Sequence, residues 1–312
     1  MPQPKHSGQR RMMRKPLVSV CLVVRNEEAI VERCLRSLAG LDGEILVVHD
    51  GPCGDRTLDI AGRYTPRVFV RPFVGHAERH RVFAYQQARG EWLLAIDADE
   101  FLSPEMAAAL PELMARPDVS GYEFVWPIWD GRRPLTSGGP LRLALMRRSA
   151  IELVGAIQNG PQVHGRVEAR PEVLHHQPSY NNFTWKTAMT KQRRWARLHG
   201  YELTRPFSQF PTFNYSGPDQ WPPHRRVLNR LSPVIALPYG AVTLVRTLRS
   251  RVWQPSRPAL RVRLRVSFYM GIYRSMVQLY VARRLYIEPV LRASRRLRNV
   301  TGKDRAVGGS DR

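Results

Sequence analysis

Apolar, strand-like runs alternate with helical stretches four times in the first third of this chain. Repeated strand–helix units give parallel strands joined by right-handed crossovers. The pattern therefore predicts an α/β fold with a doubly wound, mostly parallel sheet. No G-x-G-x-x-G follows the first run, so a dinucleotide-binding fingerprint is excluded. The strand-like runs are residues 17–24, 44–49, 67–70 and 92–96, and the helical stretches are residues 30–38, 56–64 and 75–89.

The last of these runs ends in an acidic cluster. Residues 92–96 are continuously apolar and lead directly into Asp97, Asp99 and Glu100. Such a run suits a strand buried on both faces, and an open α/β sheet places its ligand crevice at the carboxyl ends of its strands. Alternation along an extended chain predicts Asp97 and Asp99 on one side, where two oxygen donors favour a divalent cation. The alternative is an acidic turn with solvated carboxylates, which the buried strand before it disfavours.

Positive charge is concentrated at the two ends of the chain. Lys and Arg number 49 against 26 Asp and Glu, which gives a net charge of +23. Residues 1–17 hold five basic residues and no acid, and residues 225–312 hold 20 basic and three acidic residues, so 22 of the excess charges lie there. A nearly neutral body with basic extensions attracts polyanions, either nucleic acid or an anionic membrane surface.

The cysteines and the polar start of the chain indicate an intracellular, reducing setting. The three cysteines follow no metal or disulfide spacing. Residues 1–16 lack an apolar segment, so we expect no signal peptide. Residues 234–245 and 266–282 are apolar but too short, or interrupted by Pro238 and by Arg274, so we expect no clean membrane span.

Beyond the acidic cluster the pattern changes. His164, His175 and His176 lie among turn residues in the stretch 154–176. The two adjacent histidines either pack or line an acceptor cleft. We expect strands at residues 122–126 and 141–146, a helix at residues 183–203, and a loop rich in Pro and aromatic residues at 208–224.

The last third mixes apolar, aromatic and arginine residues. Residues 266–286 hold aromatic and aliphatic side chains between Arg265, Arg274, Arg283 and Arg284. This mixture suits a segment lying in a membrane interface, and the alternative is a packed helix whose arginines extend into water. The strong positive charge around the segment favours the membrane.

Three motifs in order resemble the family 2 glycosyltransferases, which have the GT-A fold. They are the first strand leading into Asn26-Glu27-Glu28, the turn Val47-Val48-His49-Asp50-Gly51, and the strand end Gly90-Glu91-Trp92 to Asp97-Ala98-Asp99-Glu100. The likeness is greatest to a bacterial branch with an Asp-Ala-Asp-Glu signature, which includes lipopolysaccharide core transferases. It covers residues 17–101 well and residues 141–195 loosely.

The resemblance implies a donor site for a nucleotide-diphosphate sugar. It implies that Asp97 contacts the ribose or the metal, that Asp99 binds Mg²⁺ or Mn²⁺ bridging the diphosphate, and that Arg81 offers a fixed positive charge to the donor. Such an ion neutralises the charge that grows as the glycosidic bond breaks. The remaining donor-binding residues implied are Asp50 for the base or ribose, with Val24, Arg25 and Glu27 beside it.

The chain departs from the family pattern in four places. His49 replaces an Asp, Pro52-Cys53-Gly54 replaces a Ser-Thr pair, and Val82 replaces an Asn. Gly165 stands where the lipopolysaccharide branch tends to have a Glu. The proton acceptor of the reaction is therefore assigned to His164 or to Glu168, the nearest carboxylate, and Glu100 is expected to support its neighbours.

The resemblance and the charge pattern together predict the following organisation: a basic arm (1–16), a nucleotide-sugar-binding half (17–101), an acceptor-side half (102–207), a linker (208–230) and a basic, partly amphipathic helical region associated with the membrane (231–312). We expect a metal-assisted, inverting transferase, peripheral on the cytoplasmic face of the cell membrane, acting on a lipid-linked or cell-envelope glycan. The alternatives are a nucleic-acid-binding protein, which the neutral body disfavours, a nucleotidyltransferase, which lacks its phosphate loop, and a non-catalytic glycosyltransferase-like subunit.

Overall fold

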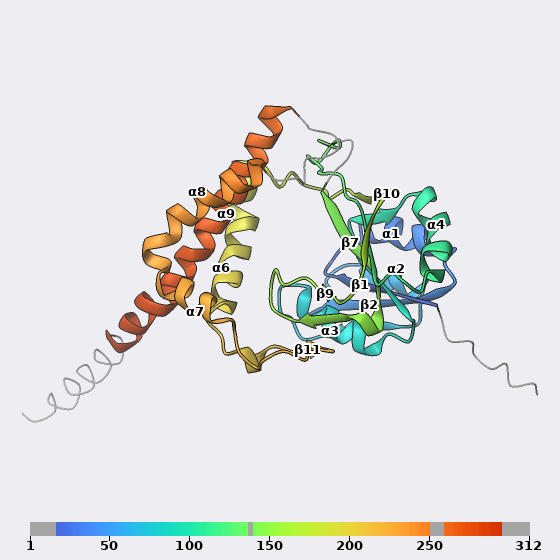
Figure 1. Cartoon of the computed structure of the whole chain (residues 1–312), viewed down its shortest axis with the longest axis horizontal. Coiled ribbons are helices and arrows are strands. Elements are labelled where there is room, and N and C mark those ends of the chain that lie inside the picture. The colour runs from blue at the N-terminus through green and yellow to red at the C-terminus, as the bar shows by residue number, and fades with distance from the viewer. Residues whose placement is uncertain (1–16, 137–139, 250–258, 295–312) are drawn as a thin grey trace, which may run out of the picture.

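A computed structural model describes residues 17–136, 140–249 and 259–294. The basic arm predicted at residues 1–16 and the basic residues from 295 onward lie outside the described residues. An eight-stranded sheet and its covering helices form one part of the molecule, and a layer of longer helices stands beside it (Figure 1). We refer to residues 17–176 as the sheet part and to residues 185–294 as the helical layer.

The first four strands confirm the predicted parallel α/β unit. They lie side by side in the order β3-β2-β1-β4, and all three pairings are parallel. The strands are β1 (Val18–Val24), β2 (Gly43–Asp50), β3 (Val68–Arg71) and β4 (Trp92–Asp97), and the helices between them are α1 (Val31–Leu38), α2 (Thr57–Gly62) and α3 (Glu78–Gln87).

Continuous apolar sequence makes β1 and β4 central strands, because both of their faces are covered. Val20 and Leu94 point into one buried cluster together with Leu35 of α1. Cys21 and Leu93 point into a second cluster, which contains residues of α3. Alternation of side chains along each strand sends successive residues to opposite faces, so apolar residues at every position stabilise packing on both sides.

The second half of the sheet is mixed. β7 lies antiparallel between β4 and β6, and β10 runs parallel to β6 and antiparallel to β5. The ten-residue β10 shows that the turn-rich expectation for residues 154–176 was wrong. The elements are β5 (Glu100–Leu102), α4 (Pro104–Ala115), β6 (Gly121–Val125), β7 (Leu141–Arg147) and β10 (Val167–His176), and a small second sheet contains β8 (Ile151–Val154), β9 (Gln162–Val163) and β11 (Thr212–Phe213).

The helical layer begins with the helical segment predicted at residues 183–203. It consists of α5 (Trp185–Thr187), a π-helical turn (Ala188–Gln192) and α6 (Arg193–Glu202). After α7 (Pro223–Arg230) come the two longest helices, α8 (Ser232–Arg249) and α9 (Leu260–Ala282), followed by a π-helical turn (Arg283–Ile287).

Glycines let α8 and α9 approach closely. A Cβ on Gly240 would lie 2.7 Å from the carbonyl oxygen of Gly271, and one on Gly271 would lie 2.8 Å from that of Gly240. Real Cβ atoms do not come this near to backbone oxygens, so the crossing requires residues without side chains. On its other side α9 packs against α6 through Ala196, Tyr273 and Val277.

Within the described residues, no single helix is long and apolar enough to cross a membrane, and only the bent pair α7–α8, broken by 107°, meets the length and composition criteria together.

Candidate functional site

The strand order places a crevice at the carboxyl ends of β1 and β4. The chain passes from β1 to β2 on one side and later returns to β4 on the other, and open α/β sheets bind ligands at such a switch point. A cavity of about 490 Å³ opens there. The structure brings seven of the predicted site residues together around it: Val24, Arg25, Glu27, Asp50, Arg81, Asp97 and Asp99.

Asp97 is held by two arginines. Nη2 of Arg81 donates to Oδ1 of Asp97 at 2.5 Å, and Nη2 of Arg142 donates to Oδ2 at 3.3 Å. Burial raises the pKa of Asp97, but the two guanidinium groups outweigh it and lower the pKa to about 2. Both carboxylate oxygens therefore already have partners, and the arrangement fixes the charge of Arg81 at the cavity wall.

Asp99 lies in a turn between β4 and β5, so the expected alternation with Asp97 along an extended strand was wrong. Its side chain still lines the cavity and is 20% exposed. Nε2 of His176, at the end of β10, lies 3.5 Å from Oδ2 of Asp99. Asp99 is thus a carboxylate that remains accessible to a ligand.

Glu100 supports this turn from below, as expected. It is 1% exposed, accepts the backbone N–H of Asp97 at 2.9 Å and the indole N–H of Trp126 at 2.7 Å, and pairs with Arg142. These contacts hold the turn in the conformation that presents Asp99.

Glu27 faces the same cavity from the end of β1. Burial, together with the negative charge of Asp99, raises the pKa of Glu27 to about 7. Crowded carboxylates of this kind favour a cation between them. Mg²⁺ is commonly held by one or two carboxylates plus substrate phosphates, so Asp99 with a bound diphosphate fits a divalent ion. Among the described residues, no group of three or more His, Cys, Asp and Glu forms a metal site by itself.

Asp50 organises the cavity wall. Its carboxylate accepts N–H groups of Val74 at 2.6 Å and Gly75 at 2.8 Å, and Nε2 of His80 lies 2.8 Å away. Burial raises the pKa of Asp50, but these hydrogen bonds lower it below its ordinary value. Its carboxylate is thus used to fix the loop before α3, and its predicted contact with the nucleotide stays a prediction.

His49, a departure from the family pattern, also has a local role. Its Nδ1 lies 2.7 Å from the carbonyl oxygen of Gly51, and its Nε2 accepts the N–H of Asn26 at 3.3 Å. The ring therefore joins the ends of β1 and β2. Gly51 has a φ of +86° and a Cβ there would lie 2.9 Å from Phe73, so the turn requires glycine.

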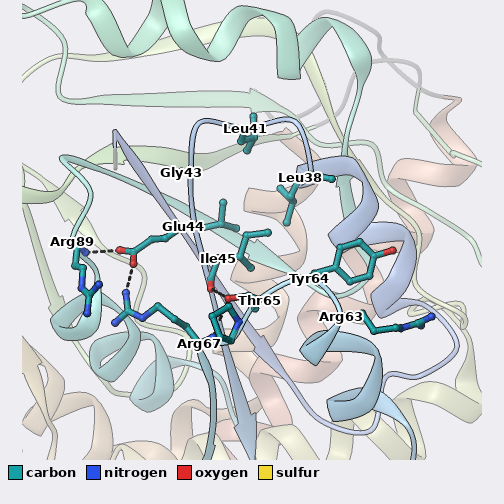
Figure 2. Close-up of a pocket in the computed structure, with 13 residues that line it drawn as sticks. Leu38, Leu41, Gly43, Glu44, Ile45, Arg63, Tyr64, Thr65, Arg67 and Arg89 are labelled. Carbon is teal, nitrogen blue, oxygen red and sulfur yellow. Dashed lines mark hydrogen bonds and ion pairs between the residues drawn. The ribbon is translucent and has the colours of Figure 1, made fainter. Parts of the chain in front are cut away.

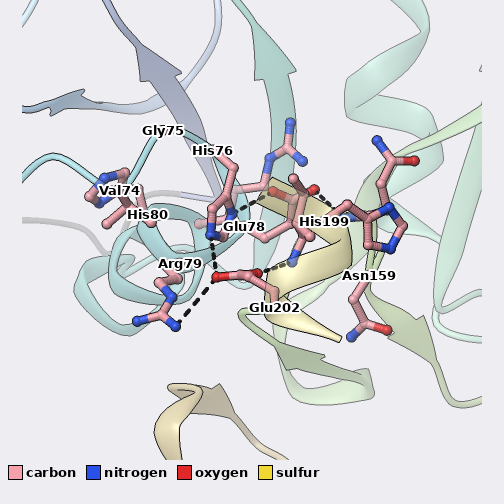
Figure 3. A network of polar contacts seen from close by, with 12 residues as sticks. Val74, Gly75, His76, Glu78, Arg79, His80, Asn159, His199 and Glu202 are labelled. Atoms are coloured by element: carbon pink, nitrogen blue, oxygen red, sulfur yellow. Dashed lines mark hydrogen bonds and ion pairs between the residues drawn. The ribbon is translucent and has the colours of Figure 1, made fainter. Parts of the chain in front are cut away.

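A buried ionic network joins this wall to the helical layer (Figure 3). Nδ1 of His76 lies 2.9 Å from Glu78, and Nε2 lies 3.1 Å from Glu202 of α6. The carboxylates also accept the N–H groups of Ile157 and Gln158, both at 2.8 Å. Burial lowers the pKa of His76, but Glu202 and Glu78 outweigh it and raise the pKa to about 9. A positive imidazole thus connects the two parts of the molecule.

The helical layer supplies basic residues that the sequence analysis missed. Lys191 and Arg194 line the cavity opposite the sheet, together with Trp195. Within the described residues neither cation has an acidic partner, and Lys191 lies over the ring of Tyr180 at 3.4 Å. Burial lowers the pKa of Lys191. Their spacing of three on a predicted helix was the available signal, because it puts both on one face.

His164 and Glu168, the predicted proton acceptors, do not line the cavity. The side chain of His164 is 64% exposed and lies 3.4 Å from Glu152. Glu168 accepts hydrogen bonds from Arg116 at 2.7 and 3.0 Å and pairs with Arg166. Nothing in their surroundings supports the assignment, which stays a prediction.

A larger cavity of about 1030 Å³ lies at the opposite end of the strands (Figure 2). Gly43, Thr65 and Arg89 line it just before β2, β3 and β4. Its acidic residue, Glu44, is already paired with Arg67 and accepts the N–H of Arg89 at 2.6 Å. The charged groups satisfy one another, so this cavity is a weaker candidate than the crevice.

Comparison with known families identifies the sheet part. Residues 19–151 match the model for "Glycosyl transferase family 2", which covers less than half of the chain. The resemblance predicted from three motifs is confirmed over this segment. Together with the sheet order it also confirms the predicted GT-A-type α/β fold.

Relatives are similar over the same segment. An "Uncharacterized glycosyltransferase" of Rickettsia bellii is 31% identical over 105 residues, which is 34% of this chain and 35% of that protein. The "Lipopolysaccharide core biosynthesis glycosyltransferase LpsC" of Rhizobium meliloti is 33% identical over 133 residues, 41% of this chain and 46% of that protein. The chain therefore matches only about a third to a half of the length of these relatives.

Solved structures are more distant. S. aureus TarS (residues 1–349) in complex with UDP-GlcNAc is 16% identical with a TM-score of 0.43, over 84% of this chain and 91% of that one. Glucosyl-3-phosphoglycerate synthase from Mycobacterium tuberculosis with Mg²⁺ and UDP is 20% identical with a TM-score of 0.31, over 36% and 44%.

Proposed function

We propose that this protein is a glycosyltransferase that moves a sugar from a nucleoside diphosphate to a hydroxyl group of a lipid-linked or cell-envelope glycan. The observation that carries the proposal is the crevice at the ends of β1 and β4. There an accessible carboxylate, Asp99, faces two cations without acidic partners, Lys191 and Arg194, inside a fold matched by the family 2 model. A diphosphate with a divalent ion complements this pairing of charges.

The residues of the chain divide the work of binding the donor. Lys191 and Arg194 face the diphosphate, and Arg81, locked to Asp97, adds a fixed positive charge. Fixed charges of this kind stabilise a leaving group without having to reorganise during the reaction. Val24, Arg25 and Glu27 at the end of β1 form the wall that faces the nucleoside.

Asp99 is the residue that would hold Mg²⁺ or Mn²⁺. A bound ion supplies neutralisation of the negative charge that develops on the departing diphosphate. The raised pKa of Glu27 fits this assignment, because it reflects excess negative charge around Asp99.

The transfer step is a single displacement with inversion. The acceptor oxygen forms a bond to C1 of the sugar, and the bond from C1 to the phosphate oxygen breaks. The electron pair leaves with the nucleoside diphosphate, and the hydroxyl proton passes to a base. His176, 3.5 Å from Asp99, is the group at this cavity edge that we assign as the proton acceptor in place of His164 and Glu168.

The helical layer supports a site of action at the cytoplasmic face of a membrane. Val234 and Leu237 of α8 are each 75% exposed, and Phe268 of α9 is 47% exposed. Arginines accompany these residues on both helices. Exposed apolar side chains next to basic ones favour an anionic lipid surface, and such a location brings the crevice to a membrane-anchored acceptor.

Binding of sugar nucleotides tests the proposed function. A panel of nucleoside diphosphate sugars should include at least one that raises the melting temperature with Mn²⁺ and less so with EDTA. Asp99→Asn should remove the metal-dependent part, whereas Asp59→Asn, an exposed carboxylate on α2, should not. If no donor binds, or if Asp99→Asn behaves as wild type, the proposal is wrong.

A further inference from the structure

A second groove begins on the other side of His176. It has a volume of about 410 Å³ and lies between the loop after β6, the segment after β10, and helices α8 and α9. Neither the family match, which ends at residue 151, nor the relatives assign it a role. His176 lines this groove while its Nε2 lies 3.5 Å from Asp99 of the donor cavity. The two spaces therefore meet at one residue.

The wall between the two spaces is rigid. The ring of His176 stacks on Trp126 with 3.9 Å between ring centroids, and Trp126 donates its indole N–H to Glu100 at 2.7 Å. Glu100 also holds the turn that presents Asp99. A molecule seated in the groove against His176 and Trp126 is thus positioned relative to the donor by the same contacts that fix Asp99.

The groove is lined mainly by apolar and aromatic side chains. The two tryptophans offer flat faces that suit either a sugar ring or a hydrocarbon chain, and α9 adds aliphatic side chains. The far wall belongs to helices whose outer faces carry the exposed apolar residues described above. The apolar lining residues are Trp126, Ile128, Trp129, Phe183, Val266 and Met270.

The charge in the groove has one sign. Arg246, near the end of α8, lines it and is exposed. Within residues 17–136, 140–249 and 259–294, no acidic side chain pairs with Arg246, and none of the described lining residues is acidic. An arginine beside an apolar groove complements an anionic group attached to an apolar body, and phosphate suits the guanidinium geometry.

We infer that this groove binds the acceptor, and that the acceptor is an amphiphile carrying a phosphate group next to its apolar part. Arg246 binds the phosphate, the aromatic lining holds the apolar part, and the reacting hydroxyl group points past His176 toward the donor. The inference rests on the proposed function, since it names the acceptor class for that same reaction. It predicts that a lipid phosphate is recognised by the protein before any sugar beyond the reacting one.

Three soluble probes separate the chemical parts of this ligand. Decyl phosphate contains both parts, decyl glucoside only the apolar part, and inorganic phosphate only the anion. Titrations followed by tryptophan fluorescence, below the micelle concentration, should show decyl phosphate binding about tenfold more tightly than either of the others. Equal binding of inorganic phosphate would show a free-anion site, and equal binding of decyl glucoside would show a merely apolar one. Either result overturns the inference.

Charge reversal at the groove gives the second arm. Arg246→Glu should weaken decyl phosphate by about tenfold or more and leave decyl glucoside unchanged. Arg249→Glu, an exposed arginine on the same helix that does not line the groove, is the matched control and should bind decyl phosphate like the wild type. Loss in both variants, or in neither, overturns the assignment of Arg246.

Nucleotide binding in the same variants separates this inference from the proposed function. Arg246→Glu should bind the nucleoside diphosphate with Mn²⁺ like the wild type, because Arg246 does not line the donor cavity. If the wild type binds nucleotide but discriminates no probe, the groove assignment is wrong and the proposed function stands. If it discriminates the probes but binds no nucleotide, the phosphate-binding groove stands and the acceptor role and proposed function are wrong.

Discussion

The sheet part and the helical layer treat their charges differently. In the sheet part the acidic residues at the crevice are already paired, Asp97 with Arg81 and Arg142, and Asp50 with His80. In the helical layer Lys191 and Arg194 face the same cavity without an acidic partner in the described part of the chain. Paired charges fix a frame, whereas unpaired charges are available to a ligand. The comparison teaches that the sheet shapes the donor site and the helices supply part of its affinity.

Their surfaces differ in the same direction. The helical layer exposes Val234, Leu237 and Val242 by 63% or more, while the sheet part exposes isolated residues such as Val70 and Phe73 at its edge. Scattered apolar residues are ordinary, but a helix pair with several in sequence provides a surface for lipid. We therefore expect changes in the sheet part to alter stability and changes in the helical layer to alter binding.

The largest expected effect concerns the joint between the two regions. His76, with its pKa raised to about 9 from an ordinary 6.5, binds more protons in the folded state than in the unfolded state. The stability that it contributes is fully present below pH 6.5 and is lost as the pH rises to about 9, by about 3 kcal/mol in all. Urea unfolding at pH 6.5 and pH 9 measures this change.

The variant His76→Gln should lose most of this pH dependence, because the titrating imidazole is gone. His224→Gln, an exposed histidine on α7, serves as the control and should keep the wild-type dependence. An unchanged pH profile in His76→Gln would show that the network of Figure 3 does not join the two regions as described.

A smaller stability change is expected inside the sheet part. Arg81→Met leaves Asp97 with only the longer contact to Arg142. We expect a loss of about 2 kcal/mol in the free energy of unfolding, below the range for fully buried pairs because 35% of the Asp97 side chain is exposed. Arg194→Met in the helical layer should cost less than about 0.5 kcal/mol. Equal losses in chemical denaturation would remove the distinction between the two regions.

Donor affinity should respond in the opposite way. Lys191→Ala and Arg194→Ala should each weaken binding of a nucleoside diphosphate by about tenfold, since each removes a charge-assisted contact, and should unfold like the wild type. Arg197→Ala on the same helix lies outside the cavity and should bind normally. Isothermal titration in the presence of Mn²⁺ measures all three, and wild-type affinity in both cavity variants would contradict the role given to the helical layer.

The smallest effect concerns the lipid surface. Replacing Val234 and Leu237 by Ser should reduce flotation with anionic liposomes by about fivefold, because each change removes an exposed apolar contact. Val70→Ser in the sheet part is matched in type and should not alter flotation. Duplex and single-stranded nucleic acid are the rival ligands. Tight, fully salt-reversible nucleic-acid binding without liposome binding would refute the membrane assignment.

The first half of the sheet was predictable because its sequence is locally consistent. Val20 and Leu94 sit in runs that are apolar at every position, which is typical of buried parallel strands, and both lie in the core. The acidic cluster followed directly from the end of such a run. β10 was missed because it contains Pro171 and charged residues and has only one fully buried position, so no apolar run marks it.

The site was predictable only where residues follow strand ends. Asp97 and Asp99 come from a strand whose position the sequence makes plain, whereas Lys191 comes from a helix almost one hundred residues later. Nothing local in the sequence says which face of that helix turns toward the sheet. The same limit explains His164 and Glu168, which were aligned through a loosely matched segment and lie outside the cavity.

Hydrogen exchange with a bound nucleotide tests most directly whether both regions build one donor site. A nucleoside diphosphate that binds with Mn²⁺ should slow amide exchange in two separate segments, the strand ends around residues 24–28 and 97–100, and the helical residues 188–195. Lys191→Ala/Arg194→Ala should weaken this protection in both segments together. Protection confined to the strand ends, with the helical residues exchanging as in the free protein, would contradict the shared site.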